Sequence, residues 1–218
     1  TDAAARRNDA LRTLKSEDAA AQRARAAKRW DHAPIAVPRL MAELEAALPA
    51  DAIVVDEAIT ASIDLARTVQ FERAGAYAGA RGGGIGQALP GALGVKLAHP
   101  DRPVVALSGD GSAMYSIQAL WTAAHHDLAV VFLILNNREY RILKHNMDTY
   151  RQRFGAKPDR GYPNMDLVAP DLGFVDLARG MGVEGMRVAA PGELRPALEK
   201  ALGAGRPFLL DVAVEGRP

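Results

Sequence analysis

The sequence predicts an α/β protein with a doubly wound, mostly parallel sheet and helices on both of its faces. Short apolar runs rich in valine, isoleucine and leucine recur along the chain, and they are too short to be typical helices. Between them lie segments whose apolar residues are spaced as on one face of a helix. Strands that alternate with helices in this way are typically parallel neighbours joined by right-handed crossovers.

The clearest strand–helix–strand unit spans residues 104–137. An apolar run at 104–107 is followed by Gly-Asp-Gly and then by Ser112, the expected N-cap of a helix with apolar residues at helical spacing. A second apolar run at 129–135 ends in two asparagines. The unit therefore predicts two parallel strands in one sheet.

Polar residues follow both strands of this unit, and parallel strands end at the same edge of a sheet. Asp110 and Asn137 should therefore meet at the edge where open α/β sheets bind ligands. A carboxylate, an amide oxygen and a backbone carbonyl form an incomplete oxygen set, which suits Mg²⁺ that also bonds phosphate and water. The glycines and the helix start near Ser112 suit an anion. The unit predicts a metal–diphosphate site; two ordinary turns are the alternative.

The rest of the chain is expected to continue the pattern. Expected strands cover residues 52–55, 183–188 and 207–214, and expected helices cover 38–48, 61–69, 87–98, 174–181 and a segment from 191. Residues 142–164 are polar and are expected to form an irregular loop at the ligand edge. We expect 1–33 to be a helical or linker segment from a preceding region and 34–218 to be the compact domain, so that the chain is a fragment.

Composition excludes several classes of function. The formal net charge is +1, which leaves no electrostatic footprint for nucleic acid or an anionic membrane. The absence of cysteine excludes disulfides and thiolate sites. No apolar run approaches the roughly 20 residues that span a bilayer, and the first residues lack the apolar core of a signal peptide. A cytoplasmic protein is the expectation.

The glycine stretch at 82–86 invites a dinucleotide-binding interpretation, which fails. The fingerprint requires a glycine at the sixth position, where the two possible registers place Gln87 and Leu89. No strand is expected before the stretch either. A loop that lets two backbone segments approach closely is the remaining interpretation from the residues alone.

The motif pair also resembles a known family. GDG followed about 25 residues later by NN resembles the diphosphate–magnesium motif of thiamine-diphosphate enzymes. The version GDGSxxYSIxALWTAA is most similar to benzoylformate decarboxylase, in the superfamily of acetolactate synthase and the 2-keto acid decarboxylases. Its matching residues are Ser112, Tyr115, Ser116, Ile117, Ala119, Leu120, Trp121 and Thr122. The resemblance covers about residues 34–218, which is the C-terminal, diphosphate-binding domain of such an enzyme.

The resemblance implies two cofactors, thiamine diphosphate and Mg²⁺, and a 2-keto acid substrate. The implied reaction is non-oxidative decarboxylation through a thiazolium ylide. An acetolactate synthase-like carboligation, or a module that binds the cofactor without turnover, remain alternatives. The metal would be held by Asp110, Asn137 and the backbone carbonyl of Glu139. On the residues alone, Glu139 is otherwise a solvated loop acid.

The resemblance also assigns cofactor contacts. The Thr60 hydroxyl would bind the diphosphate, although Thr60 can equally be a helix N-cap. The Gly83 carbonyl would accept a hydrogen bond from the aminopyrimidine, and Ile85 would hold the cofactor in its bent shape. The remaining implied cofactor-binding residues are Gly109, Asp110, Gly111, Ser112, Asn137, Glu139 and Tyr140.

No catalytic residue is expected in this chain, because the family's catalytic glutamate lies in a pyrimidine-binding domain, usually of another subunit. A homodimer or homotetramer is therefore expected. Ile142 and Asn146 depart from the small and aromatic residues of the family's aryl pocket, so the particular 2-keto acid stays open. His125, His126 and His145 are expected to be solvated or capping residues.

Overall fold

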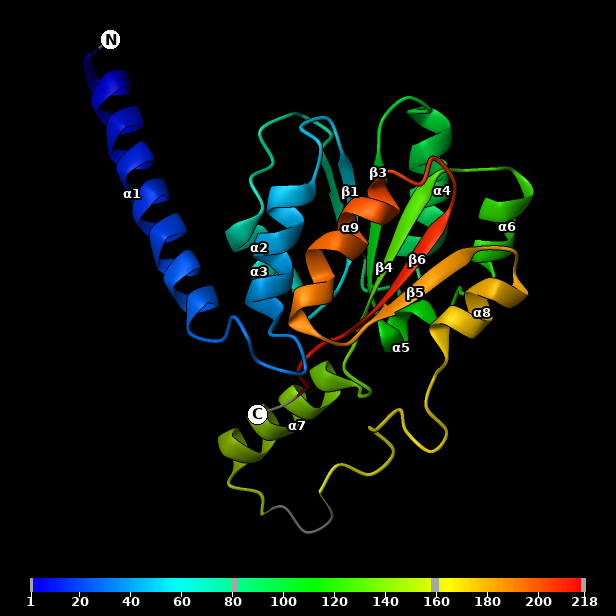
Figure 1. The fold of residues 1–218 in the computed structure, drawn as a ribbon. Helices are drawn as coiled ribbons and strands as arrows, with labels where there is room; N and C mark the ends of the chain where they lie inside the picture. Colours follow the sequence, from blue (N-terminus) through cyan, green and yellow to red (C-terminus); the bar gives the residue numbers. More distant parts are fainter. Residues whose placement is uncertain (1, 80–81, 158–160, 217–218) are drawn as a thin grey trace.

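The structure, a computed structural model, describes residues 2–79, 82–157 and 161–216. Within these residues, six strands form one sheet in the order β2-β1-β3-β4-β6-β5, and every pair of neighbours is parallel (Figure 1). The strands are β1 Ile53–Glu57, β2 Tyr77–Gly79, β3 Val104–Gly109, β4 Val130–Asn136, β5 Glu184–Val188 and β6 Phe208–Ala213. This arrangement confirms the predicted fold class.

Helices cover both faces of the sheet (Figure 1). One apolar cluster joins the sheet to α2, α3 and α9, and a second joins it to α4, α6 and α8. The helices are α1 Asp2–Ala27, α2 Val37–Ala47, α3 Ser62–Thr68, α4 Ala88–Ala98, α5 Asp110–Ala113, α6 Ala119–His125, α7 Arg141–Phe154, α8 Phe174–Gly180 and α9 Leu194–Leu202, with a 3-10 turn, η1, at Pro191–Glu193.

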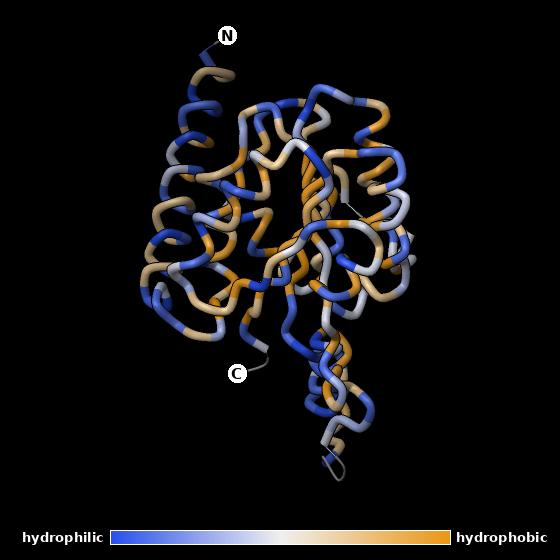
Figure 2. The backbone as a smooth tube through the Cα atoms, turned by 45° about the vertical axis from the view of Figure 1, so that its right-hand side comes forward, coloured by the Kyte–Doolittle hydropathy of each residue, from blue (hydrophilic) through white to orange (hydrophobic). Residues whose placement is uncertain are grey.

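The central strand β4 shows why the apolar runs become buried strands. Its seven residues are all buried, and successive side chains point alternately into the two clusters. Leu133 packs on the side of α2, and Phe132 packs on the side of α4. A strand covered on both faces must be apolar throughout, so it carries a continuous apolar run and not an alternating pattern. Figure 2 shows the apolar residues concentrated in this central sheet.

Helix α1 is largely exposed and extends along one side of the domain (Figure 1). Its one buried residue is Ala26, and two ion pairs also join it to the domain. Arg25 pairs with Asp64 at 3.0 Å, and Lys15 approaches Glu72 at 3.6 Å. In the part of the chain that the structure describes, no helix is both long enough and apolar enough to cross a membrane.

Two sequence expectations about the ligand edge are wrong. Most of the expected irregular loop is helix α7, which ends at Gly155 in the left-handed conformation with φ of 62°. A short strand, β2, precedes the glycine stretch and pairs with β1, although none was expected. Both elements are short of buried apolar residues, so the periodicity of the sequence does not reveal them.

The helix expected from Ser112 is also different. The chain turns directly from β3 into the short helix α5, whose N-cap is Gly109, so Ser112 lies inside the helix and is not its N-cap. After the turns at 114–118, the helix α6 begins at Ala119. The strand therefore continues to the residue before Asp110, which places this carboxylate directly at the strand's end.

Candidate functional site

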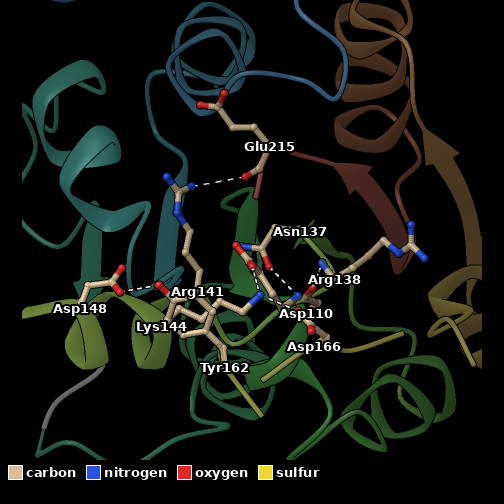
Figure 3. A network of polar contacts seen from close by, with 10 residues as sticks. Asp110, Asn137, Arg138, Arg141, Lys144, Asp148, Tyr162, Asp166 and Glu215 are labelled. Atoms are coloured by element: carbon tan, nitrogen blue, oxygen red, sulfur yellow. Dashed lines mark hydrogen bonds and ion pairs between the residues drawn. The ribbon is translucent and has the colours of Figure 1, made fainter. Parts of the chain in front are cut away.

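The ends of β3 and β4 lie side by side, and a buried carboxylate joins them. Asp110 is only 3 % exposed. One of its oxygens, Oδ1, accepts the Gly111 N–H at 2.7 Å, and Oδ2 accepts the Arg138 N–H at 2.6 Å. Figure 3 shows Asp110, Asn137 and Arg138 together at this edge. The backbone after β4 is therefore fixed by the side chain that follows β3.

A cavity of about 340 Å³ opens above these strand ends. It is lined by nine of the ten residues for which the sequence suggested a cofactor contact: Thr60, Ile85, Gly109, Asp110, Gly111, Ser112, Asn137, Glu139 and Tyr140. The tenth, Gly83, lines a neighbouring cavity of about 400 Å³, and Ile59 and Ile85 line both. Ile142 also lines the first cavity, whereas Asn146 and the three histidines named above are not among its described lining residues.

Burial raises the pKa of Asp110 to about 6, because the surroundings disfavour its charged form. Hydrogen bonds from the backbone N–H groups of Gly111, Arg138 and Asn137 lower the pKa, and the charge of Asp211 raises it. A cation placed against this carboxylate would favour its ionised form. Asp110 has no cationic partner among the described ion pairs, so its carboxylate is available to such a cation.

Gly111 has no room for a side chain. A Cβ atom at this position would lie 2.7 Å from the Tyr140 ring, which is closer than a carbon contact allows. The glycine therefore allows the Tyr140 ring to pack directly over the start of α5. This contact helps to set the cavity wall between the two strand ends.

Glu139 is not a solvated acid. It is buried, and the Lys144 ammonium binds its carboxylate. Lys144 also pairs with Asp166 at 2.5 Å. Burial lowers the pKa of Lys144, but the hydrogen bonds and charges of Asp166 and Glu139 outweigh this effect and leave the pKa raised. The Glu139 backbone carbonyl accepts the Arg141 N–H at 2.9 Å.

The turn after β1 forms another wall of the 340 Å³ cavity. Ile59 lies there in the left-handed region, with φ of 53°, which is unusual for a β-branched residue. The turn is held by Asp56, which accepts the Ala58 N–H at 2.9 Å and the Ser62 hydroxyl at 3.1 Å. Helix α3 has Ala61 as its N-cap and no side-chain capping bond, so the N-cap alternative for Thr60 is wrong.

Glu57 is a site residue that the sequence reasoning missed. It is the last residue of β1 and is buried, and its carboxylate accepts the Gly86 N–H at 2.6 Å and the Ala88 N–H at 2.8 Å. These bonds attach the glycine loop and the start of α4 to the sheet edge. An acidic residue at the end of a strand was a signal, but its partners lie about 30 positions away and cannot be identified from spacing.

The fold is that of an α/β domain with a cavity at the carboxyl edge of a parallel sheet, which is where open α/β sheets bind their ligands. Residues 60–212 match the family described as "Thiamine pyrophosphate enzyme, C-terminal TPP binding domain". The chain belongs to this family, which confirms the resemblance carried by the two motifs.

The relatives of this chain include both an acetolactate synthase and benzoylformate decarboxylases. IlvX of Mycobacterium tuberculosis, provisionally an acetolactate synthase large subunit, is 41% identical over 78% of this chain and 33% of its own length. Benzoylformate decarboxylase of Pseudomonas aeruginosa is 38% identical over 79% of this chain and 31% of its own. The structure of a thiamine diphosphate-dependent 4-hydroxybenzoylformate decarboxylase from Rhodococcus jostii RHA1 matches with a TM-score of 0.75 and 36% identity, over 84% of this chain and 33% of that one. The chain thus spans about a third of the length of these relatives.

The raised pKa of Asp110 predicts a pH-dependent stability. With the folded pKa near 6 and the unfolded value near 3.8, the neutral form favours folding below pH 4, and this contribution is lost as the pH rises through 6. Relative to Asp110→Asn, the metal-free wild type should lose up to roughly 3 kcal/mol between these limits. Urea unfolding of both proteins in chelator at pH 4 and pH 7.5 measures the difference. A stability difference that does not change with pH would contradict the assignment.

Glu57→Gln should loosen the glycine loop. The replacement keeps one acceptor oxygen but turns an NH₂ group toward a backbone N–H, which should cost about 1–3 kcal/mol of stability. Hydrogen exchange should become faster at Gly86 and Ala88, which mass spectrometry of the matching peptides can detect. The exposed Glu199→Gln is the control and should change stability by less than about 0.5 kcal/mol. Unchanged exchange at the loop would show that Glu57 does not hold it.

Proposed function

We propose that the chain holds thiamine diphosphate through Mg²⁺ in the 340 Å³ cavity, as the diphosphate-binding part of a 2-keto acid decarboxylase similar to benzoylformate decarboxylase. One observation carries the proposal. Asp110 and Asn137, at the ends of adjacent parallel strands, line one cavity, and a buried carboxylate in that cavity has no cationic partner among the described ion pairs. The family relationship supports the cofactor, and the donor set supports the metal.

The donor set fits Mg²⁺ that is shared with a phosphate. No group of three or more histidine or acidic side chains is placed to hold a metal within the described ranges. The set is instead one carboxylate from Asp110, the amide oxygen of Asn137 and the backbone carbonyl of Glu139. A carboxylate has about four acceptor sites, so Asp110 keeps capacity for a cation beside its backbone N–H partners. Three oxygens leave coordination positions for diphosphate and water, as Mg²⁺ prefers.

The remaining cavity residues have distinct parts in the proposal. Thr60 and Ser112 offer hydroxyl groups to the diphosphate from opposite walls, and the glycines beside Asp110 let backbone N–H groups come close to it. The Tyr140 ring closes the wall over Gly111. Thr60, Ser112 and Tyr140 therefore bind and orient, and none of them is proposed to move a proton.

Bound thiamine diphosphate supplies the electron sink that the loss of carbon dioxide requires. The chain's part is to orient it and to exclude water. The apolar side chains of Ile59, Ile85, Ile142 and Leu143 line the cavity and serve the second purpose. We propose that the catalytic glutamate comes from a pyrimidine-binding domain of another subunit, in a cytoplasmic homodimer or homotetramer.

Binding should depend on both Mg²⁺ and Asp110. Calorimetric titration of thiamine diphosphate into this chain should give heat with Mg²⁺ and none with chelator, and Asp110→Ala should abolish the signal because the metal loses its charged ligand. Asp101→Ala, in an exposed turn, is the matched control and should bind as wild type. Absence of binding by the wild type in Mg²⁺ would refute the proposed function.

The similarity to IlvX favours a carboligase as the second candidate. Incubation of the chain, assembled with the pyrimidine-binding domain proposed above, with thiamine diphosphate, Mg²⁺ and benzoylformate or pyruvate separates the candidates by product. A free aldehyde with carbon dioxide is the expected result for a decarboxylase, whereas acetolactate from pyruvate would establish carboligation. Cofactor binding by this assembled protein without either product would favour a non-catalytic binding module.

A further inference from the structure

Arg141 places a positive charge in the cavity where no sequence motif indicated one. It is the first residue of α7, and its side chain is partly buried. Among the described residues that line the cavity it is the only arginine or lysine. Figure 3 shows its side chain extending from α7 toward Glu215.

The guanidinium of Arg141 is weakly engaged. Its one side-chain hydrogen bond goes from Nη1 to the Glu215 backbone carbonyl at 3.3 Å, which is long. No carboxylate lies within ion-pair distance of it in the part of the chain that the structure describes, whereas the nearby Lys144 binds both Glu139 and Asp166. A guanidinium has five N–H donors in a fixed fork, so most of the donors of Arg141 remain for a ligand or water.

The net charge of the proposed site with its ligand favours a second positively charged group beside Mg²⁺. Mg²⁺ brings two positive charges, and an ionised Asp110 offsets one of them. Glu139 contributes little net charge because Lys144 neutralises it. A diphosphate carries more negative charge than the single positive charge that remains. An arginine whose fork matches phosphate oxygens is suited to supply the rest.

We propose that Arg141 binds the diphosphate group directly, as a second cation beside Mg²⁺, with its N–H donors on phosphate oxygens. This inference rests on the proposed function, since it concerns the same ligand. The contact with Glu215 is weak enough to be exchanged for a charge-assisted hydrogen bond when the ligand enters. Arg141 would thus contact only the phosphate group, so its contribution to binding would not depend on the organic part of the cofactor.

Calorimetric titration with inorganic pyrophosphate and Mg²⁺, and separately with thiamine diphosphate and Mg²⁺, tests the role. Arg141→Gln should weaken both by roughly 10- to 100-fold, the range for loss of a hydrogen bond to a charged group. Arg141→Lys should recover part of the loss, because it restores the charge without the fork. Arg153→Gln, an exposed arginine on the same helix, should bind as wild type.

The outcomes separate the two claims. If the wild type binds and Asp110→Ala does not, but Arg141→Gln and Arg141→Lys bind like the wild type, the role of Arg141 is overturned and the proposed function stands. If the wild type binds neither probe, both are overturned. Thermal unfolding of each variant checks folding. If Arg141→Gln does not fold, Arg141→Lys decides. A pyrophosphate affinity of Arg141→Lys equal to that of the wild type would overturn the proposed contact through the guanidinium fork, because the lysine supplies only the charge.

Discussion

The site depends on one buried hydrogen-bonded carboxylate that joins two strand ends. β3 and β4 pair in parallel, so the backbone leaves both strands at the same edge, and the Asp110 carboxylate accepts an N–H from each following segment. The bond from Arg138 crosses 28 positions of sequence and fixes the segment after Asn137 relative to α5. The parallel register brings the two segments together, and the short, charge-assisted bonds keep them there.

Three other buried carboxylates form hydrogen bonds or ion pairs within the protein. Glu57 binds backbone N–H groups, Glu139 binds Lys144, and Asp211 binds Asn136 at 2.9 Å and Arg187 at 2.9 Å. Burial raises the pKa of Asp211, while Asn136 and Arg187 lower it. A buried charge that is paired and hydrogen-bonded is tolerated, and one facing a cavity with only N–H partners keeps capacity for a ligand. Asp110 is of the second kind.

The fold and part of the site could be predicted because they follow from apolar periodicity and from the ends of strands. The positions of Asp110 and Asn137 needed only the rule that parallel strands end together. Helix α7 was missed because it buries no apolar stripe, only Lys144, and contains asparagine, aspartate and threonine, which favour helices weakly. Glu57 and Arg141 were missed because their importance lies in tertiary contacts, which neither composition nor spacing specifies.

The two cavities constrain the shape of any ligand that fills both. They share Ile59 and Ile85, so a wall of two apolar side chains separates the cavity over Asp110 from the one lined by Gly83 and Glu57. In the proposed function, a ligand with its anionic end at Asp110 and its other end at the Gly83 carbonyl would pass these two side chains. The left-handed backbone of Ile59 and the hydrogen bonds of Glu57 to the glycine loop hold the wall from opposite sides. We propose that the two isoleucines, which line both cavities, offer the apolar contact at which the cofactor bends.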